Sequence, residues 1–508
     1  MIATSTPAAV EAGRQILAAG GSAADATVAA AAALVVTEPT GCGLGGDAFA
    51  IVSPPEAPPQ GLNASGCCPR ALSARDLRGQ GLDAVPPEGW LPVTVPGIVS
   101  GWWALHQRHG RLPWARVLEP SRQLAREGFE VSPAVAAQWE AGGARRFGGR
   151  EGFEPFTGTW LLPGPRAPAA GESFRNPDLA DTLEHLARGG REAFYQDLAV
   201  TIATHARDTG GFLTREDLAA HQEEWVDPVP VRYHGATVWE LPPSGQGLVA
   251  SLALALADPL PVPSGEQLLA PSRLHRLAEC LRQAIAVGRL HLADPRHMTT
   301  SVAALLEPGF VDRLRAAIRP DTVLGDPGTV YLAVADADGM LVSWIQSNYM
   351  GFGSGMVVPG TGISMQNRGC GFTLEPGHPN ELQPGKRPFH TIIPAYLEHA
   401  GRRAAFGVMG GPMQPQGHIQ VATALLDHQV TPQEACALPR FRVLDGRRIC
   451  LEAGIPEATR EALARLGHEL TPEPGPWAFG GAQMVLRHPG GTLEGGSDPR
   501  KDGHVARA

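Results

Sequence analysis

Gly328-Thr329-Val330-Tyr331-Leu332-Ala333-Val334-Ala335 is a mainly apolar run. An Asp336-Ala337-Asp338-Gly339 segment follows it, and then Met340-Leu341-Val342-Ser343-Trp344-Ile345-Gln346-Ser347. Both apolar runs are rich in β-branched and aromatic residues, and the Asp-Gly pair between them favours a tight turn. The sequence therefore predicts a β-hairpin whose first strand begins at Thr329.

A threonine at the start of a strand gains chemistry if the chain is cut immediately before it. A threonine hydroxyl is a weak nucleophile unless a base lies within hydrogen-bonding distance, and a free α-amine on the same residue can be that base. Such an amine has a pKa of about 7.7 to 8.0, so part of it is neutral near neutral pH. The segment Gly325-Asp326-Pro327-Gly328 offers a flexible place for the cut. We therefore expect autocleavage between Gly328 and Thr329.

The rest of the chain reads as scaffold. Ala8 to Ala19 is a predicted helix that ends at Gly20-Gly21, and a second helix runs to about Val36 behind a capping box of Ser22 and Asp25. Residues 99–220 and 266–294 are mostly helical in pattern. Further predicted strands are 48–52, 404–409, 449–452 and 483–487, and further predicted helices are 416–426 and 456–466.

A glycine loop, Gly41-Cys42-Gly43-Leu44-Gly45-Gly46, formally matches the dinucleotide-binding pattern G-x-G-x-x-G. That fingerprint requires a strand before the glycines and a helix after them. Here a predicted helix precedes the loop and a predicted strand follows it. We therefore interpret the glycines as structural, allowing close packing where the helix meets the sheet.

Composition limits the class of protein. The chain has 508 residues, a formal net charge of −9 and no long run of Lys and Arg, which argues against nucleic-acid or anionic-membrane partners. The N-terminal residues lack a secretory signal, and no apolar stretch is long enough to span a membrane, so a cytoplasmic location is expected. Seven cysteines without zinc spacing predict ordinary free thiols.

Several spaced motifs resemble those of the γ-glutamyltransferase (γ-glutamyltranspeptidase) family. In the first two-thirds of the chain these are residues 19–26, 38–47 and 95–102. In the last third they are Gly328-Thr329-Val330-Tyr331, Pro384-Gly385-Lys386-Arg387-Pro388, Met409-Gly410-Gly411 and Ser497-Asp498-Pro499-Arg500. Because the motifs occur in the family's order over nearly the whole chain, the chain is identified as a member.

The resemblance implies an α+β fold: a four-layer αββα sandwich of the N-terminal-nucleophile hydrolase type. Autocleavage would give a large subunit, 1–328, and a small subunit, 329–508, which stay together as a heterodimer and form one catalytic domain. Thr329 aligns with the family nucleophile, Ser347 with a hydroxyl that orients it, and Gly410 and Gly411 with the amides of the oxyanion hole. Ser347 can also be a polar residue that merely ends a strand. No metal or cofactor is implied.

The sequence departs from the family where a γ-glutamyl group is held. Ser65 stands in place of a carboxylate-binding arginine, Cys370-Gly371 replaces an acidic pair, and His390-Thr391 replaces twin serines. The neighbourhoods of Arg368, His390 and Gln414 instead resemble a side branch that includes oxamate amidohydrolase-like proteins. The γ-glutamyl pocket is therefore expected to be rebuilt.

Six residues are candidates for binding substrate. Arg368 is the main one, since a guanidinium can hold a carboxylate through two hydrogen bonds; a surface salt bridge is the alternative. The others are Asn348, Tyr349, His390, Thr391 and Arg75. His390 can equally be a buried histidine with a protein partner, and we interpret Lys386-Arg387 as structural.

These observations predict a hydrolase that cleaves a small-molecule amide through a threonyl acyl-enzyme. A γ-glutamyl compound such as glutathione is the substrate that the family implies. A small carboxylate-bearing amide, such as oxamate, or an acylase substrate is the alternative within the same chemistry. Two other classes stay open: an inactive binding protein that keeps the fold, and a metal-dependent hydrolase, which the scattered histidines disfavour.

Overall fold

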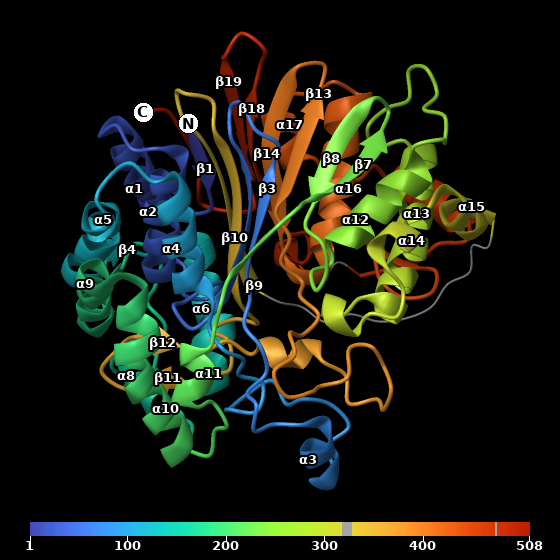
Figure 1. Cartoon of the computed structure of the whole chain (residues 1–508). Coiled ribbons are helices and arrows are strands. Elements are labelled where there is room, and N and C mark those ends of the chain that lie inside the picture. Colours follow the sequence, from blue (N-terminus) through green and yellow to red (C-terminus); the bar gives the residue numbers. More distant parts are fainter. Residues whose placement is uncertain (317–327, 473–474) are drawn as a thin grey trace.

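The computed structural model describes residues 1–316, 328–472 and 475–508. Gly325, Asp326 and Pro327 of the expected cleavage segment lie outside the described residues. Figure 1 shows two large sheets that face each other, with helices on the outer side of each. The two chain ends lie close together in that view, and strand β1 pairs with β20.

One described sheet has seven antiparallel strands in the order β20-β1-β9-β10-β2-β3-β6. These are β20 (Val505–Ala506), β1 (Ile2–Thr4), β9 (Gly328–Ala335), β10 (Leu341–Tyr349), β2 (Asp47–Ser53), β3 (Gln60–Ala64) and β6 (Glu224–Val226). The predicted hairpin is confirmed as β9 and β10, with Val334 opposite Val342. The strand that begins the last third of the chain therefore lies between the N-terminal strand and β10.

The other large described sheet has six strands in the order β19-β18-β14-β13-β8-β7. They are β19 (Leu493–Ser497), β18 (Gly481–Arg487), β14 (Arg402–Met409), β13 (Ala395–His399), β8 (Ala236–Glu240) and β7 (Val229–Tyr233). Smaller sheets are formed by β15 (Phe441–Val443), β16 (Arg448–Leu451) and β17 (Glu469–Thr471), by β11 (Val357–Val358) and β12 (Ile363–Ser364), and by β4 (Phe129–Glu130) and β5 (Ser173–Phe174).

The helices fall into two groups (Figure 1). Those beside the seven-stranded sheet include α1 (Pro7–Ala18), α2 (Ala23–Thr37), α4 (Ile98–His109), α5 (Trp114–Glu127), α6 (Pro133–Trp139), α7 (Arg145–Phe147), α8 (Glu154–Trp160), α9 (Pro177–Glu192), α10 (Ala199–Asp208) and α11 (Arg215–Ala219). Those beside the six-stranded sheet include α12 (Gly247–Ala257), α13 (Pro271–His291), α14 (Val302–Leu305), α15 (Pro308–Ala316), α16 (Gln414–Asp427), α17 (Pro432–Ala437) and α18 (Glu457–Arg465). Helix α3 (Ala74–Gly79) lies apart from both, at the periphery.

Period-two alternation explains how both faces of each sheet are buried. Tyr331 and Ala333 of β9 belong to the apolar cluster that also contains Tyr396 and Ala405 of the other sheet. Their neighbours Val330, Leu332 and Val334 belong instead to the cluster formed with α1 and α2. Since successive side chains of a strand point to opposite faces, β9 packs against a sheet on one side and helices on the other.

Helix α2 is buried along its whole length, which its alanines make possible. The predicted capping box is confirmed: Asp25 N–H donates to Ser22 Oγ (3.1 Å), and Ser22 N–H donates to Asp25 Oδ2 (2.9 Å). No helix in the described parts is both long and apolar enough to cross a membrane. All seven cysteines lie in those parts and are free thiols, as predicted.

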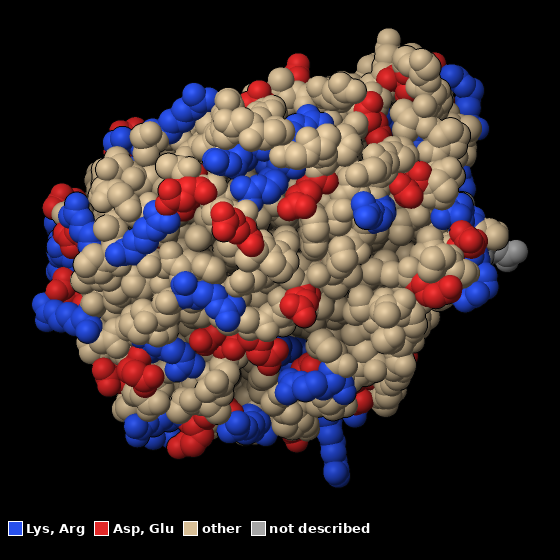
Figure 2. Space-filling view, turned by 45° about the horizontal axis from the view of Figure 1, so that its top comes forward, with Lys and Arg blue, Asp and Glu red and all other residues tan. Residues whose placement is uncertain are grey.

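The exterior carries both signs of charge. On the face shown in Figure 2, Lys and Arg side chains are interspersed with Asp and Glu side chains. Many of the exposed arginines have an acidic neighbour close in the chain, as in the pairs Arg14–Glu11 and Arg188–Glu184. This face therefore has no broad field of a single sign.

Candidate active site

Thr329 lies at the start of β9, and its hydroxyl meets that of Ser347. Thr329 Oγ1 donates to Ser347 Oγ at 3.3 Å, and Tyr349 N–H donates to the same Ser347 oxygen at 2.8 Å. Thr329 is 4% exposed and Ser347 is fully buried. The hairpin thus brings together the two hydroxyls that the sequence singled out.

An irregularity in the hairpin places Ser347. The register of β9 and β10 shifts between Gln346 and Tyr349, where Tyr349 pairs with Gly328. Tyr349 has a φ of +79°, a left-handed conformation that costs energy for a residue with a bulky side chain. A bulge of this kind redirects side chains at the end of a strand. The hydrogen bond from Tyr349 N–H to Ser347 Oγ holds the Ser347 hydroxyl in position.

The glycine loop presses against this end of the hairpin. A Cβ atom on Gly46 would lie 2.5 Å from the Ser347 carbonyl oxygen, and one on Gly43 would lie 2.8 Å from Asn348 Nδ2. Helix α2 precedes the loop and strand β2 follows it. The structural interpretation of the loop is therefore confirmed, since only residues without side chains fit there.

Gly410 and Gly411 form a sharp turn after β14. Their φ angles are +117° and +53°, in the left-handed region that favours glycine. Among the described loops and turns, no backbone hydrogen bond is donated by either residue. The Gly411 carbonyl accepts a hydrogen bond from Gln246 Nε2 at 2.7 Å, which anchors the turn to the residue before α12.

Thr329 and Gly410 line one cavity of about 250 Å³. Its other walls come from α6 and the segment after it, from the Trp477–Gly480 segment, and from the C-terminal residues Arg500 and Lys501. Lys501 Nζ pairs with Glu38 Oε1 at 2.9 Å, so part of its charge is balanced. The cavity accommodates a small molecule, with the Thr329 hydroxyl and the Gly410 turn at its wall.

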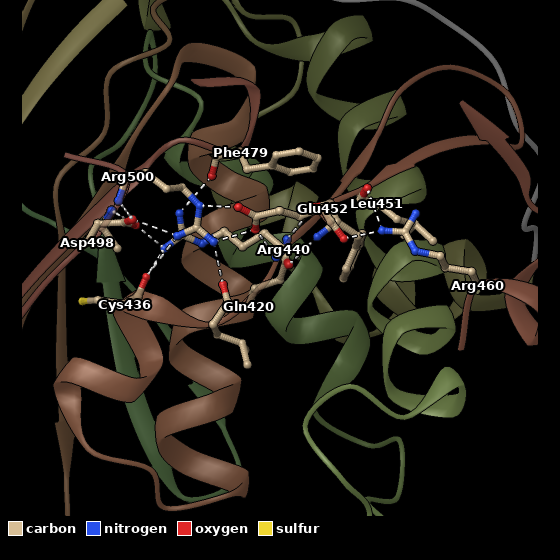
Figure 3. Close-up of polar contacts among 12 residues, drawn as sticks. Gln420, Cys436, Arg440, Leu451, Glu452, Arg460, Phe479, Asp498 and Arg500 are labelled. Carbon is tan, nitrogen blue, oxygen red and sulfur yellow. Dashed lines mark hydrogen bonds and ion pairs between the residues drawn. The ribbon is translucent and has the colours of Figure 1, made fainter. Parts of the chain in front are cut away.

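A buried ion-pair network supports the wall near Arg500 (Figure 3). Arg440 Nη2 donates to Asp498 Oδ2 (2.7 Å), and Arg440 Nη1 donates to the Phe479 carbonyl (2.9 Å). Arg500 pairs with Asp498 (2.8 Å) and with Glu452 (2.5 Å). Burial alone would raise the pKa of Asp498, but the two guanidiniums and backbone N–H donors lower it. The carboxylate is therefore held in its charged form.

Arg368 is fully buried beneath the hairpin end. Its Nη1 donates to Thr391 Oγ1 (2.8 Å), and its guanidinium lies 4.1 Å from the centre of the Tyr349 ring. Its Nε and Nη2 atoms have no hydrogen-bond partner in the described structure. Burial lowers the pKa of Arg368 to about 10, so the group stays cationic at neutral pH. The surface salt-bridge alternative is thereby wrong.

Asn348 lies between Ser347 and Tyr349, and its backbone carbonyl accepts from Asn367 N–H at 3.2 Å. Neither the nitrogen nor the oxygen of its side-chain amide has a partner among the described residues. The structure therefore gathers four of the six predicted substrate residues, Asn348, Tyr349, Arg368 and Thr391, around the end of β10.

His390 has a different environment from the one expected of a substrate contact. It is fully buried, and its Nε2 lies 3.1 Å from Asp47 Oδ2. Burial, together with the charge of Arg368, lowers the pKa of His390 well below its usual value, so the ring is neutral. Asp47 also accepts from Gln366 Nε2 (3.0 Å). His390 thus fits the alternative of a buried histidine with a protein partner, and Asp47 is a site residue that the sequence did not reveal.

Arg75 is not brought to the site. It is exposed on α3, which packs by way of Leu77 against Phe372 and Leu382. Like the other five predicted substrate residues, it does not line the cavity that contains Thr329. The same holds for Lys386 and Arg387: Lys386 Nζ donates to the Glu381 carbonyl (2.9 Å), and Arg387 pairs with Glu224 (2.8 Å), which fits their structural interpretation.

Comparison with known proteins identifies the family of this chain. The family model described as Gamma-glutamyltranspeptidase matches residues 9–508. The chain belongs to the gamma-glutamyltranspeptidase family. The resemblance found in the motifs is therefore confirmed.

Relatives within the gamma-glutamyltranspeptidase family differ in their activities. The chain is 37% identical over 513 residues to the oxamate amidohydrolase proenzyme of Klebsiella pneumoniae, covering 97% of this chain and 95% of that protein. It is 35% identical over 516 residues to the glutathione hydrolase-like YwrD proenzyme of Bacillus subtilis, with the same coverage. The crystal structure of cephalosporin acylase from Bacillus halodurans superposes with a TM-score of 0.94 at 42% identity, covering 100% of this chain and 95% of that one. The mixed helix-and-sheet fold is thus that of this family.

One cluster has the composition of a metal site. His275, Glu279 and His468 have ligand atoms within 4.8 Å of one another, so these histidines are closer in space than their scatter in the sequence suggested. However, His275 Nδ1 and His468 Nε2 are hydrogen-bonded to each other (2.7 Å), and Arg282 Nη2 donates to His468 Nδ1 (2.9 Å). That donor keeps the proton of His468 on Nε2, where a metal would need a lone pair. The donor arrangement therefore does not fit a metal ion.

Proposed function

We propose that the chain is a proenzyme that cuts itself between Gly328 and Thr329 and then hydrolyses small-molecule amides. The observation that carries this proposal is the contact of Thr329 Oγ1 with Ser347 Oγ at the wall of the cavity that Gly410 also lines. Relatives named as proenzymes of amide hydrolases support it.

In the cutting step, the Thr329 hydroxyl attacks the Gly328 carbonyl and an ester replaces the peptide bond. Water then cleaves that ester. The products are a carboxylate on Gly328 and a free α-amine on Thr329. Ser347, whose oxygen accepts the hydrogen bond of the Thr329 hydroxyl, orients the attacking group.

The products of the cut are a large subunit, 1–328, and a small subunit, 329–508. Their association is supported by strand pairing across the cut, because β9 pairs with β1 and β10 pairs with β2. In the second sheet, β13 of the small subunit pairs with β8 of the large one. We therefore propose a heterodimer in which both subunits build one αββα sandwich.

In turnover, Thr329 Oγ1 attacks the substrate's amide carbonyl while the Thr329 α-amine accepts the hydroxyl proton. The same amine passes that proton to the departing nitrogen, which leaves as an amine or ammonia. Water, deprotonated by the α-amine, then releases the acid from the threonyl ester. The Gly410 and Gly411 N–H groups are proposed to stabilise the oxyanion, a role for which their lack of side chains and of described backbone acceptors suits them.

The proposed substrate is an amide that carries a carboxylate close to the scissile bond. Arg368 supplies the buried positive charge, with two N–H-bearing nitrogens unpartnered, and Asn348 supplies an unpartnered amide. Thr391 and Tyr349 hold the guanidinium in place. His390 contacts Asp47 and is not proposed to contact the substrate, and Arg75 has no proposed role in binding.

A γ-glutamyl compound such as glutathione is the family's general substrate. The glutathione hydrolase-like proenzyme (35%) supports that substrate, and an oxamate-like amide or an acylase substrate is the alternative, supported by the oxamate amidohydrolase proenzyme (37%) and cephalosporin acylase (42%). The same relatives argue against a binding protein that has lost its activity.

Turnover of a substrate panel tests the proposal. The panel comprises oxamate, glutathione, a γ-glutamyl anilide and the neutral amide propionamide. We expect the processed protein to hydrolyse the carboxylate-bearing amides of the panel. The Thr329→Ala variant should hydrolyse none of them. Arg368→Met should raise KM for the carboxylate substrates about tenfold or more and leave the neutral amide unchanged, since a lost charge-assisted bond is worth about 1.5 to 3 kcal/mol. Equal losses on both substrate types would contradict the role of Arg368.

A further inference from the structure

A second cavity lies apart from Thr329. It has a volume of about 500 Å³, and neither Thr329 nor Gly410 lines it. One wall comes from α12 and the end of α13, a second from residues 371–389, and a third from Pro412 and Pro415. Residues of both proposed subunits therefore enclose it.

The walls of this cavity are mainly apolar. Val249, Ile285, Leu292, Phe372 and Phe389 contribute hydrocarbon and aromatic surface. Asn380 is among the polar wall residues, but both ends of its side chain are occupied: Nδ2 donates to the Gly371 carbonyl (2.6 Å), and Oδ1 accepts from Phe389 N–H (3.0 Å). Cavities of this size with apolar walls and a few polar groups are typical of small-molecule sites.

Arg289 is the cation of this cavity. No hydrogen bond or ion pair of Arg289 is found in the described structure, and its buried Nη2 atom has no partner. No aspartate or glutamate lines the cavity. Burial lowers the pKa of Arg289, and the acidic group whose charge opposes this shift is Asp445, but in the described parts the two side chains are not within ion-pair distance. A partly buried guanidinium whose Nη2 has no partner favours an anionic ligand group.

We propose that this cavity binds a small monocarboxylate with an aromatic or aliphatic body, its carboxylate on Arg289 and its body between Ile285, Phe372 and Phe389. Arg289 and Phe389 are partly exposed, so the cavity is reached from the surface. Gln246 also lines it and donates to the Gly411 carbonyl (2.7 Å), which places the ligand near the Gly410–Gly411 turn in a cavity that Thr329 does not line.

Calorimetric titration of the purified protein with phenylacetate tests this site, with 2-phenylethanol as the neutral probe. We expect phenylacetate to bind and the alcohol to bind about tenfold or more weakly. Arg289→Met should weaken phenylacetate binding about tenfold or more, because it removes a charge-assisted bond. Ile285→Trp, which fills the cavity, should abolish binding. Arg188→Met removes an exposed arginine elsewhere and should change nothing.

Three outcomes would overturn the proposal. Phenylacetate does not bind, or it binds equally well to Arg289→Met and Ile285→Trp, or its binding is lost only when the Thr329 cavity is blocked by Gly142→Trp. Thermal melting of each variant shows that it is folded. Repeating the titration on Thr329→Ala separates this site from the proposed activity, since binding here does not require the cut.

Discussion

At the scale of single residues, the site rests on a pair of hydroxyls that are 18 positions apart in the sequence. Thr329 and Ser347 meet because β9 and β10 form a tight hairpin, and the Tyr349 N–H fixes the Ser347 oxygen. A nucleophile held in this way is oriented before substrate arrives. We therefore propose that Ser347 orients Thr329 and does not merely end a strand.

Replacing Ser347 tests this orientation. We expect Ser347→Ala to fold and to bind substrate with a similar KM, but to lose about 10²-fold in kcat, since small misplacements of a reacting group cost rates of that order. Cleavage before Thr329 should slow as well. Stopped assays and gel time courses measure both rates, with Ser343→Ala as the matched control on the same strand. An unchanged kcat would show that Ser347 has no positioning role.

The sequence predicted some of these residues better than others. Thr329, Gly410 and Gly411 lie in local motifs, so their candidate roles followed from neighbouring residues, whereas Ser347 was assigned from the family resemblance. Asp47 was missed because its partner His390 is 343 positions away and nothing in either segment indicates the other. Arg75 was proposed from its residue type alone, and its exposure on α3 depends on tertiary packing that local sequence does not encode.

At the scale of elements, the glycine loop after α2 is the part that positions the hairpin end. Gly46 faces the Ser347 carbonyl too closely for any side chain. We expect Gly46→Ala to destabilise the fold by about 1 to 3 kcal/mol, as overpacking does, and to slow maturation.

Gly79→Ala is the matched control for that change. Gly79 is exposed on α3, and a Cβ atom there would meet nothing within 4 Å. Alanine favours a helix over glycine, so the control should be neutral or slightly stabilising. Thermal melting of the two variants compares them directly, and equal stabilities would contradict the close packing of the loop.

The Arg440–Asp498–Arg500 network gives an acid-sensitive element next to the cavity. Because the pKa of Asp498 is lowered in the folded state, its stabilisation is complete above the ordinary aspartate pKa of about 3.9 and is lost as the pH falls through the lower folded value. Asp498→Asn should therefore be less stable at neutral pH and should lose less stability on acidification to about pH 3. Melting temperatures across that range measure this, with exposed Asp338→Asn as control. Parallel curves for Asp498→Asn and the original chain would contradict the assignment.

The elements themselves were largely predictable. The hairpin, α2 with its capping box, and strands β14 and β18 have clear local patterns. Strands β1 and β20 were not predicted, since each is short and becomes a strand by pairing with distant chain. The β7–β8 hairpin was missed as well, although Val229–Glu240 alternates in burial along much of its length.

At the scale of the whole molecule, the two proposed subunits share both large sheets. In the seven-stranded sheet β1 lies between β20 and β9, in the six-stranded sheet β13 borders β8, and residues from before and after the proposed cut form the apolar cluster between the sheets. Cutting the proposed bond between Gly328 and Thr329 should therefore leave this packing intact. Sequence motifs indicated this family, but only the strand order shows that strands from before and after the proposed cut pair within the same sheets.

Intact-mass analysis of the purified protein, with N-terminal sequencing of the smaller fragment, tests the central claim most directly. We expect two fragments, 1–328 and 329–508, that elute together without denaturant, with Thr329 at the start of the second and a single uncut chain for Thr329→Ala. Catalytically active protein with an unbroken chain between Gly328 and Thr329 would contradict it.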